Sequence, residues 1–494
     1  MKKNTREPNL LEALIPLIIL IALLSLNVVI YNDNATYGPN QIALIIGALV
    51  AALIGVKLGY SWEQIQKGMV KSINSAMSAI LILLVIGALS GTWMLSGIVP
   101  TMIYYGLQLM HPSYFLLAAC IICCIVSLAT GSSWSTVATV GVALLAIGTV
   151  MGVSLGMCAG AIISGAYFGD KMSPLSDTTN LAPAMAGGDL FTHIRYMMYT
   201  TIPSIIITFI IFGVLGFYIM PENNQQGIND LLQAMESKFY ISPVLFLVPL
   251  TVFGLIALKV EALPALFVGV VLGGFVASFA QPQLIKEISG NTGDYATAAY
   301  KAVLQAMTTD VKIPTKNESI SKLLSTRGMS GMLNTIWLVL CAMCFGGAME
   351  VSGLLKKITQ TVMRKVESTG SLIATTAGTC IFFNATASDQ YLAVVVPGRM
   401  FAKEFRDRGL KPENLSRTLE DSGTITSVLF PWNTCGAAQA SVLGVATGTY
   451  WMYCFFNLLS PLMTVFYAYM NIKIKRFTPE EMEEIAKKDV LEKN

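Results

Sequence analysis

Residues 124–132 read CIVSLATGS, and residues 380–388 read CIFFNATAS. The two stretches begin 256 residues apart, at positions 124 and 380, and they align without a gap. One further residue of offset places Pro174 on Pro431. Similarity at a fixed distance is the signature of an internal structural repeat. The sequence therefore predicts that the chain folds as two related halves.

The sequence around these stretches is apolar. Of the 494 residues, 54% are hydrophobic and 12% are charged, whereas about a quarter of the residues of a soluble domain are charged. A helix that crosses a membrane needs about 20 largely apolar residues. A polytopic membrane protein is therefore predicted, which excludes soluble enzymes, secreted scaffolds and nucleic-acid-binding proteins. The predicted spans are residues 11–31, 41–59, 74–95, 153–187, 196–220, 240–259, 262–280, 328–350, 418–447 and 449–472.

Other segments complete the predicted organisation. Residues 113–150 and 370–404 are apolar but interrupted by polar clusters, which is typical of helical hairpins that enter the membrane and return. Residues 61–72 are predicted to form an interfacial amphipathic helix, and a capping box at Thr478 and Glu481 predicts a short helix in the tail. The expected division is a first repeat, a connecting loop, a second repeat with one polar insertion and a cytoplasmic tail. These parts are residues 1–220, 221–239, 240–472 (insertion 281–327) and 473–494.

Each half contains five predicted spans and one hairpin, and an odd number of crossings turns the second copy upside down. Basic residues test this inversion, because Lys and Arg stay in cytoplasmic loops. Residues 97–110 and 149–160 contain neither Lys nor Arg, whereas their counterparts are basic. The basic residues of those counterparts are Lys356, Lys357, Arg364, Lys365, Arg406, Arg408, Lys411 and Arg417. Equivalent loops therefore lie on opposite sides, and both termini are expected in the cytoplasm.

The expected fold class is thus an all-α polytopic membrane protein with two inverted-topology repeats. Each repeat has about five transmembrane helices and one re-entrant helical hairpin, with broken helices at the membrane midplane. Inverted repeats of this kind are typical of secondary transporters.

Four polar interruptions mark the predicted breaks. Within lipid, a broken helix is tolerated only where it lines a cavity inside the protein. Freed carbonyls and side-chain oxygens can bind a cation in such a cavity. The interruptions are residues 130–135, 173–180, 384–390 and 431–436, which read TGSSWS, SPLSDTTN, NATASDQ and PWNTCG.

Two of the interruptions contain an acid, Asp177 and Asp389. A carboxylate within a membrane span is costly and needs a partner or a function. The repeat places Asp177 opposite Thr434 and Asp389 opposite Ser133, so each half has one acidic and one neutral interruption. Two related cation sites are therefore predicted.

The first predicted site contains Ser132, Ser133, Ser176, Asp177 and Thr178, with Na⁺ at Ser132, Ser133 and Asp177. The second contains Ser388, Asp389, Asn433 and Thr434, with Na⁺ at Ser388, Asp389 and Asn433. Thr130, Asp170 and Thr386 are further candidates for binding the cation or substrate. The alternative is that these side chains only cap helix ends, that Asp170 pairs with the adjacent Lys171, and that Asp421 pairs with the basic loop 405–417.

A buried carboxylate suggests how transport is coupled. Burial favours the protonated acid, and a bound cation favours the ionised form. One aspartate therefore holds either H⁺ or Na⁺, and this competition is sufficient for antiport if the site opens to each side in turn. Na⁺ and H⁺ are the expected coupling ions, and no other cofactor is expected.

The run from Gly165 to Asn180, GAYFGDKMSPLSDTTN, and the earlier TGSSW at residues 130–134 resemble the NhaC-type Na⁺/H⁺ antiporter family. The resemblance covers nearly the whole chain. It implies a Na⁺/H⁺ antiporter of the ion-transporter superfamily, in which paired hairpins and broken helices carry the transport sites. It also implies Ser132, Ser133, Asp170 and Asp177 as transport residues.

The same family includes members that resemble Na⁺-lactate/H⁺-malate antiporters. A Na⁺-coupled organic-acid exchanger therefore stays open as the alternative function. A small carboxylate could rest against the amides around Ser132 and Ser388 without any buried arginine.

An enzyme is the alternative of a different class. Tyr167 stands where the Gly-x-Gly-Asp signature of intramembrane aspartyl proteases needs its first glycine. The sequence contains neither a His-Glu-x-x-His motif nor a Walker A motif. The chain is therefore expected not to be an enzyme, and a passive channel is the remaining alternative.

The expected partners are membrane lipids, Na⁺, H⁺ and, for the alternative function, a small carboxylate. A homodimer is possible, and nucleic acid is excluded as a partner. The expected location is the bacterial cytoplasmic (inner) membrane.

Overall fold

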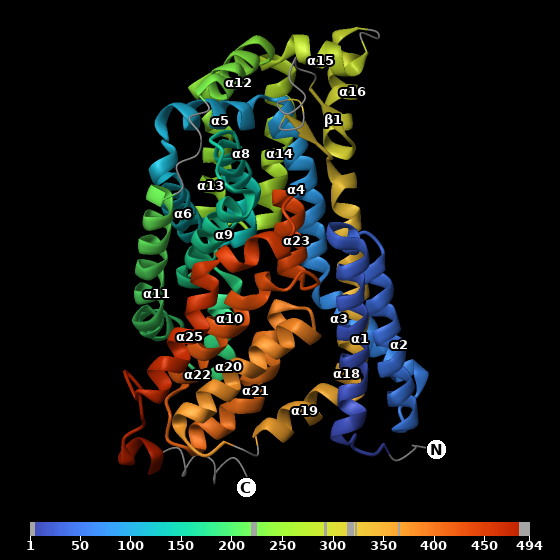
Figure 1. Ribbon diagram of the computed structural model, residues 1–494, viewed down its shortest axis with the longest axis vertical. Helices are drawn as coiled ribbons and strands as arrows, with labels where there is room; N and C mark the ends of the chain where they lie inside the picture. Colours follow the sequence, from blue (N-terminus) through green and yellow to red (C-terminus); the bar gives the residue numbers. More distant parts are fainter. Residues whose placement is uncertain are drawn as a thin grey trace.

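The computed structural model describes residues 5–218, 225–290, 294–313, 321, 324–363 and 366–483. Across these ranges the chain is mainly helical (Figure 1). The described residues contain one small antiparallel sheet, in which Val311 pairs with Thr326. The predicted all-α fold class is confirmed.

The first half contains α1 (Leu10–Tyr31), α2 (Pro39–Lys57), α3 (Trp62–Ser75), α4 (Met77–Leu95), α5 (Ile98–Leu109), α6 (Pro112–Thr130), α7 (Ser133–Thr136), α8 (Val142–Val150), α9 (Leu155–Met172), α10 (Asp177–Ala186) and α11 (Leu190–Tyr218). A 3₁₀ turn, η1 (Asn32–Thr36), follows α1, and a π-helical turn, η2 (Val137–Gly141), joins α7 to α8.

The second half contains α12 (Gln225–Lys238), α13 (Leu247–Ala257), α14 (Ala262–Ala280), α15 (Pro282–Ser289), α16 (Tyr295–Thr308), β1 (Val311–Lys312), β2 (Ser325–Thr326), α18 (Leu333–Val351), α19 (Leu354–Met363), α20 (Thr369–Thr386), α21 (Gln390–Asp407), α22 (Pro412–Leu419), α23 (Thr434–Leu443), α24 (Thr447–Tyr450) and α25 (Phe455–Tyr469). Short 3₁₀ turns are η3 (Pro243–Phe246), η4 (Met329–Met332), η6 (Ser427–Leu429) and η7 (Trp451–Tyr453). A π-helical turn, η5 (Glu420–Thr424), continues α22.

The helix boundaries recur at the predicted offset. α4 and α5 begin at residues 77 and 98, and α18 and α19 begin 256 residues later, at 333 and 354. The equivalent helices α5 and α19 lie at opposite ends of the molecule (Figure 1). This is the arrangement that an inverted repeat requires.

The turns of the two hairpins differ by one residue. α6 ends at Thr130 and α20 ends at Thr386, but α7 begins after two further residues and α21 after three. The N-cap residues of α7 and α21 are Ser132 and Asp389. Asp389 is therefore the counterpart of Ser132, and its predicted alignment with Ser133 is wrong, because the second turn contains one additional residue.

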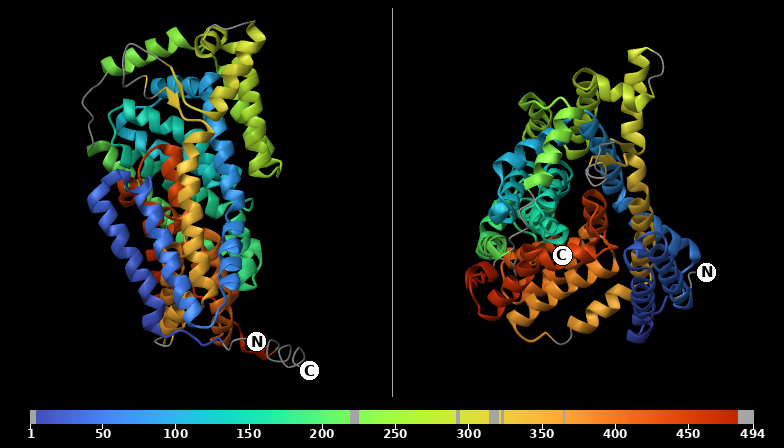
Figure 2. Two further views of the ribbon diagram at one scale, coloured as in Figure 1. Left: turned by 90° about the vertical axis from the view of Figure 1, so that its right-hand side faces the viewer. Right: turned by 45° about the horizontal axis from the view of Figure 1, so that its top comes forward.

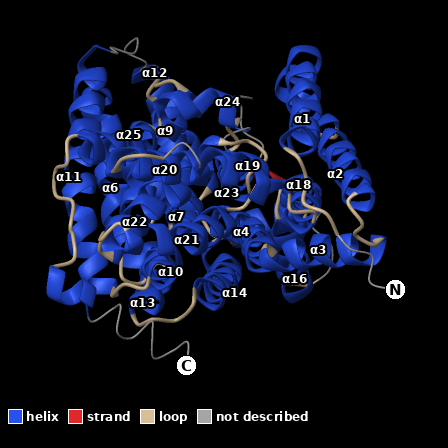
Figure 3. Cartoon of the chain, turned by 90° about the horizontal axis from the view of Figure 1, so that it is seen from below, coloured by secondary structure: helices blue, strands red, loops and turns tan. Residues whose placement is uncertain are grey.

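The two halves of the chain are interleaved in space. α2 and α3 pack against α18, while α14 and α16 pack against α4. Figure 2 shows the blue N-terminal helices beside the yellow-orange α18. Seen along the long axis, α1 and α2 lie at one edge of the molecule and α11 at the opposite edge (Figure 3). Part of the predicted connecting loop 221–239 forms the helix α12.

The helices have the length and surface of a multi-pass membrane protein. Eight described helices are long and apolar enough to cross a membrane, and up to ten spans result if each of two bent helix pairs counts as one. Large apolar side chains such as Ile18, Ile210 and Phe279 are exposed on them, and an extensive exposed apolar surface marks contact with lipid or protein. Two predicted spans, 153–187 and 418–447, are broken helices.

Two smaller predictions concern helices outside the main spans. Segment 61–72 is helical as predicted and lies in α3, whose N-cap Ser61 accepts a hydrogen bond from the Gln64 amide; its position at the membrane interface stays a prediction. In the tail, Thr478 and Glu481 form the predicted capping box, and the described part of the helix begins at Pro479. The polar insertion 281–327 contains α15, α16 and both strands.

Candidate functional site

The carboxylate of Asp170 lies at the meeting point of two broken segments of the first half. Asp170 is in the last turn of α9 and is 8% exposed. The Ser133 hydroxyl donates to its Oδ2 at 2.6 Å, and the Ser176 hydroxyl donates to its Oδ1 at 2.6 Å. Ser133 opens α7, whereas Ser176 is the N-cap residue of α10. The Ser176 hydroxyl oxygen accepts no cap hydrogen bond from the α10 backbone, while its proton is donated to Asp170.

Glycine allows the broken segments to approach so closely. Gly131 ends α6 in the left-handed region, with φ of 68°. A Cβ atom at this position would lie 2.7 Å from the Leu175 Cβ and 2.9 Å from the Ser176 nitrogen. A side chain here would therefore separate the α6–α7 turn from the α9–α10 turn, and it would also strain the backbone.

A chain of hydroxyl groups connects Asp170 to an acid of the second half. The hydroxyls of Ser176 and Thr178 are 3.1 Å apart, and Thr178 donates to Glu420 Oε1 at 3.0 Å. Glu420 is fully buried in the η5 turn, and its Oε2 has no hydrogen-bond partner among the described residues. Such π-helical turns occur frequently at functional sites. The two carboxylates, one from each half, are thus joined through two side chains.

Lys171 follows Asp170 in the sequence, and Asp421 follows Glu420. Lys171 and Asp421 form a fully buried ion pair between the halves. The hydroxyls of Thr200, Ser460 and Thr464 also donate to Asp421. Lys171 therefore does not pair with Asp170, and Asp421 does not pair with the basic loop 405–417. Both alternatives are wrong, because the last turn of α9 directs its two charged side chains to different partners.

Several residues of the first predicted site lie elsewhere. Asp177 is exposed, and its nearest described hydrogen-bond partner is the Tyr391 hydroxyl, 3.4 Å from Oδ2. Ser132 accepts a hydrogen bond from the Ser135 amide at 3.2 Å, and the hydroxyls of Thr130 and Thr136 lie 3.3 Å apart. The structure therefore does not bring Asp177 together with Ser132 and Ser133. Asp177 follows the N-cap Ser176 directly, and successive helical residues face different directions.

The second predicted site forms a connected cluster. Asp389 is buried and caps α21, where the Leu392 amide donates to its Oδ1 at 2.9 Å. The Thr434 amide donates to the Ser388 carbonyl at 2.9 Å. Asn433 donates through Nδ2 to the carbonyl of Asn384 at 3.0 Å. Ser388, Asp389, Asn433 and Thr434 therefore gather as predicted, and Asn384 joins them.

Thr386, the last residue of α20, behaves differently. Its hydroxyl donates to the Phe382 carbonyl at 2.7 Å, within its own helix. This hydrogen bond is the local role that the capping alternative describes.

Ser388 has an unusual backbone and an unpaired hydroxyl. Its φ is 60°, a value that a residue with a side chain rarely adopts. Its Oγ is buried and has no hydrogen-bond partner among the described residues. Backbone strain of this kind concentrates at functional sites, so the hydroxyl is a candidate cation ligand.

We expect Ser388→Gly to separate stability from binding. Glycine relieves the left-handed backbone, which stabilises the fold by roughly 0.5–1 kcal/mol, but it removes the hydroxyl. The Na⁺-free protein should therefore melt at a higher temperature than wild type, and the additional stabilisation by Na⁺ should decrease. Differential scanning fluorimetry in detergent, with and without Na⁺, measures both effects.

Ser388→Ala is the matched control, because it removes the hydroxyl without relieving the backbone. It should lose the Na⁺ effect and gain no intrinsic stability. A wild-type response to Na⁺ in both variants would exclude Ser388 as a ligand.

Sequence reasoning missed a buried arginine. Arg417 in α22 is fully buried, and none of its three side-chain nitrogens has a hydrogen-bond partner among the described residues. Its guanidinium carbon lies 4.4 Å from the centroid of the Tyr196 ring. The buried His193 contacts Ser416 at 2.7 Å through Nδ1, and its Nε2 is unpaired in the described part of the chain. The suggested carboxylate site at the amides around Ser132 and Ser388 did not require a buried arginine, but the described part of the chain contains one.

Glu420 carried a usable signal that the sequence prediction did not exploit. It lies inside the predicted span 418–447. A carboxylate within a membrane span is energetically costly, which was the reason for selecting Asp177 and Asp389. The same rule, applied to every acid within a predicted span, would have identified it.

Inverted repeats whose broken helices meet at buried acids define the class of ion-coupled secondary transporters. A family model described as "Na+/H+ antiporter family" matches residues 165–472. The chain belongs to this Na⁺/H⁺ antiporter family, and the resemblance noted from the sequence is confirmed.

Three curated relatives match almost the full length of the chain. The "Na(+)/H(+) antiporter NhaC" of Alkalihalophilus pseudofirmus is 38% identical over 434 residues, which cover 88% of this chain and 91% of the relative. The "Malate-2H(+)/Na(+)-lactate antiporter" of Bacillus subtilis is 36% identical over 468 residues, with coverages of 94% and 96%. The "Arginine/ornithine antiporter ArcD" of Halobacterium salinarum is 33% identical over 483 residues, with coverages of 97% and 96%.

Proposed function

We propose that this chain exchanges Na⁺ for H⁺ across a membrane by alternating access, and that the two ions compete for Asp170. The observation that carries this proposal is the burial of the Asp170 carboxylate between hydroxyls from two broken segments. A hydroxyl is both a donor and an acceptor. Ser133 and Ser176 can therefore donate to the empty carboxylate and turn their oxygens toward a cation when Na⁺ enters.

A protonated Asp170 and a Na⁺-bound Asp170 are both neutral overall. The conformational change that switches the site from one opening to the other therefore moves no net charge through the low-dielectric interior, where an uncompensated charge is costly. Each Na⁺ carried in one direction then requires the release of a proton, and each proton taken up requires the release of Na⁺. Competition at one carboxylate thus couples the two flows without a further energy source.

Glu420 extends the proton-carrying part of this site. The hydroxyls of Ser176 and Thr178 connect it to Asp170. A second buried carboxylate, on the opposite half, lies two hydroxyl groups and three hydrogen-bond contacts away from a proton that Na⁺ displaces from Asp170. Movement of one half against the other would make or break this connection and so help to set the direction of release.

The cluster around Ser388 and Asp389 is the second proposed cation site. Asp389 supplies a carboxylate, the unpaired Ser388 hydroxyl supplies an oxygen, and Asn433 and Thr434 close the cluster. It occupies the position in the second half that corresponds to the Ser133 and Ser176 turns in the first. The pseudo-symmetry of the repeats therefore supports two related cation sites.

The proposed location is the bacterial inner membrane, with both ends of the chain in the cytoplasm. The first and last described segments of the chain lie at the same end of the molecule as α19 (Figure 1). The basic residues Lys356 and Lys357 belong to that helix. Lys and Arg favour the cytoplasmic side.

Purified protein in liposomes that contain a pH-sensitive dye tests the exchange. A pulse of external Na⁺ should drive protons out of the vesicles, and the response should saturate with Na⁺. K⁺ at equal ionic strength should produce no such response, and a protonophore should abolish the pH change. If Na⁺ and K⁺ produce the same signal, the proposed exchange is incorrect.

A second candidate function is exchange of a small organic acid, and Arg417 favours it. A fully buried guanidinium without a hydrogen-bonded partner is costly, and its planar donor groups match a carboxylate. We expect that, if an organic acid is carried, lactate or malate raises the melting temperature of wild type but not of Arg417→Met. Thermal shifts scanned over lactate, malate and arginine measure this.

The exposed Arg399 provides the matched control. Arg399→Met should retain any shift caused by the acid. Arg417→Met should be at least as stable as wild type without ligand, because it removes an unpaired buried charge. A ligand-induced shift that survives in Arg417→Met would rule out Arg417 as the carboxylate-binding residue.

A further inference from the structure

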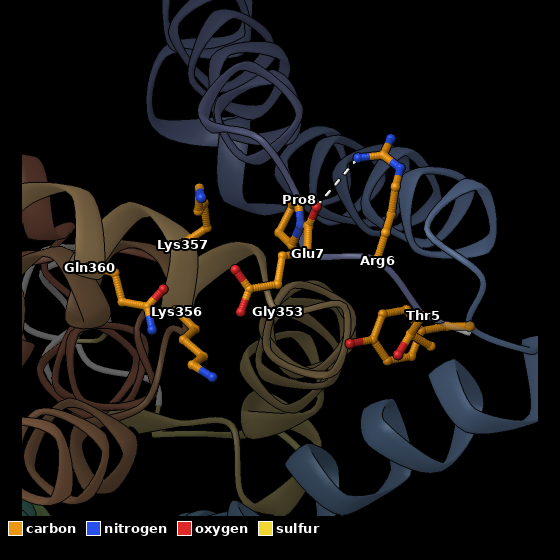
Figure 4. Close-up of a pocket in the computed structure, with 9 residues that line it drawn as sticks. Thr5, Arg6, Glu7, Pro8, Gly353, Lys356, Lys357 and Gln360 are labelled. Atoms are coloured by element: carbon orange, nitrogen blue, oxygen red, sulfur yellow. Dashed lines mark hydrogen bonds between the residues drawn. The ribbon is translucent and has the colours of Figure 1, made fainter. Parts of the chain in front are cut away.

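A polar pocket lies between the N-terminal segment and α19, and its lining includes none of the acids of the proposed cation sites. Its volume is about 140 Å³. Arg6 and Glu7 form part of one wall, and Lys356, Lys357 and Gln360 form part of the opposite wall (Figure 4).

Hydrogen bonds and an ion pair hold the first wall in place. The Arg6 amide donates to the Leu58 carbonyl at 3.0 Å. Its guanidinium donates through Nη1 to Glu12 at 2.9 Å, and Lys57 lies 3.4 Å from the same carboxylate. The N-terminal segment is therefore fixed against the end of α2 and the start of α1.

The second wall is anchored by the apolar face of α19. Leu354, Leu355 and Ile358 are buried, whereas Lys356 is exposed and Lys357 is half-buried. This pattern places the lysines on the polar face of a short amphipathic helix.

The charges of the pocket favour an anion. Neither Lys356 nor Lys357 is within ion-pair distance of an acid among the described residues. Arg6 is neutralised by Glu12, so the two lysines are opposed only by the Glu7 carboxylate in the lining. Lysine presents three donors. The pocket therefore suits a group with several acceptor oxygens, and Glu7 suits a hydroxyl donor beside that group.

The size and position of the pocket indicate the source of that group. One water occupies roughly 30 Å³ of liquid, so a volume of about 140 Å³ admits a group as large as phosphate. The pocket adjoins the start of α1, where Leu11, Ile15 and Ile18 are 74%, 42% and 62% exposed. Their spacing of four and three residues makes one apolar stripe. Such a stripe can contact acyl chains while a headgroup occupies the pocket.

We propose that this pocket binds the phosphate of an anionic lipid headgroup, with Lys356 and Lys357 as the phosphate ligands and Glu7 accepting a headgroup hydroxyl. Basic pockets between transmembrane helices at the cytoplasmic side bind acidic lipid headgroups. The lipid joins the N-terminal helices to α19, and this role is independent of ion exchange at Asp170.

The experiment uses the delipidated full-length protein in detergent and measures melting temperature as lipid is added. Phosphatidylglycerol should act at lower concentration than phosphatidylcholine. In Lys356→Gln/Lys357→Gln the concentration of phosphatidylglycerol for half of the maximal effect should rise about 10- to 30-fold, because each lysine near an anionic surface contributes about 1 kcal/mol. Lys67→Gln/Lys71→Gln on α3 is the matched control and should change it less than about twofold.

Glu7→Gln provides a test in the opposite direction and does not depend on the stability of the lysine variant. Removal of this acid should strengthen the binding of phosphatidylglycerol if the repulsion between Glu7 and the phosphate exceeds the lost contact with the headgroup hydroxyl. It should also reduce the preference of the protein for phosphatidylglycerol over phosphatidic acid, whose phosphate has no headgroup hydroxyls beside it. Equal effects of phosphatidylglycerol and phosphatidylcholine, or an unchanged lysine variant, would overturn the proposal. If inorganic phosphate or glycerol 3-phosphate raised the melting temperature fully at the concentrations at which the lipid acts, the bound phosphate group would not need to come from a lipid, and that part of the proposal would be wrong.

Discussion

Asp170→Asn is expected to abolish Na⁺-driven proton movement in liposomes. Asparagine keeps the size of the side chain, but it replaces one acceptor oxygen by an NH₂ donor and holds neither a proton nor a balancing negative charge. Loss of one partner of a buried charged contact costs about 2–5 kcal/mol, and about 1.4 kcal/mol equals a factor of ten. The initial rate at a fixed Na⁺ concentration should therefore fall at least about 30-fold.

Asp177→Asn is the matched control, because it makes the same chemical change seven positions along the chain on an exposed side chain. Its rate should stay within about twofold of wild type, as for most exposed polar changes. Both variants should be compared at equal amounts of reconstituted, folded protein. The reverse result, with activity lost in Asp177→Asn and kept in Asp170→Asn, would place the essential carboxylate at the N-terminus of α10.

The contrast between these two aspartates shows what sequence can predict about the site. The polar stretch 173–180 is recognisable as a break in an apolar helix. The direction of the chain after the break is not encoded in residue spacing, so burial could not be assigned between Asp170 and Asp177. The Gly131 approach to Leu175 settles the geometry, and this contact joins segments that are more than forty residues apart.

The fold could be predicted better than the site, because helix starts and polar breaks recur at an offset of 256 or 257 residues. Which helices pack against each other could not be predicted from the sequence. Helices such as α4 and α14 are apolar around most of their circumference, and apolar contact with lipid competes with apolar contact with protein. Hydropathy therefore could not predict that α14 packs against α4 or that α2 packs against α18.

Charge inside the protein shows a similar limit. Glu420 and Asp421 fall within a predicted span, and the energetic cost of burial marks both of them. Arg417 lies one residue before the same predicted span, where a basic residue is ordinarily a cytoplasmic anchor. Only the course of α22 into the protein shows that this arginine is buried.

Lys171→Met should cause a large loss of stability. The pair of Lys171 with Asp421 is fully buried and joins the two halves. Removal of one partner of a buried ion pair costs about 3–5 kcal/mol, because the other charge remains without compensation. The melting temperature in detergent should fall clearly, together with the yield of monodisperse protein.

The double variant Lys171→Met/Asp421→Asn should recover at least half of that loss. It removes both charges, and asparagine still offers an acceptor oxygen and an NH₂ donor to the hydroxyls of Thr200, Ser460 and Thr464. Replacement of a whole buried pair is often neutral, whereas a side chain that left these hydroxyls unpaired would be costly. Equal melting temperatures for the single and double variants would indicate that packing of the lysine stem, rather than its charge, stabilises the interface.

Lys238→Met is the control for charge removal in general. Lys238 pairs with Glu287 at 3.0 Å in a partly exposed position, and such a pair contributes about 0–1 kcal/mol. The difference between the two lysine variants therefore measures the effect of burial.

If the buried pair is also broken during transport, the double variant should melt close to wild type and still exchange Na⁺ at an altered rate. The reason is that Lys171 and Asp421 adjoin the two acids, Asp170 and Glu420, that we propose carry protons. Normal stability combined with a changed rate would identify the pair as part of the moving interface between the repeats.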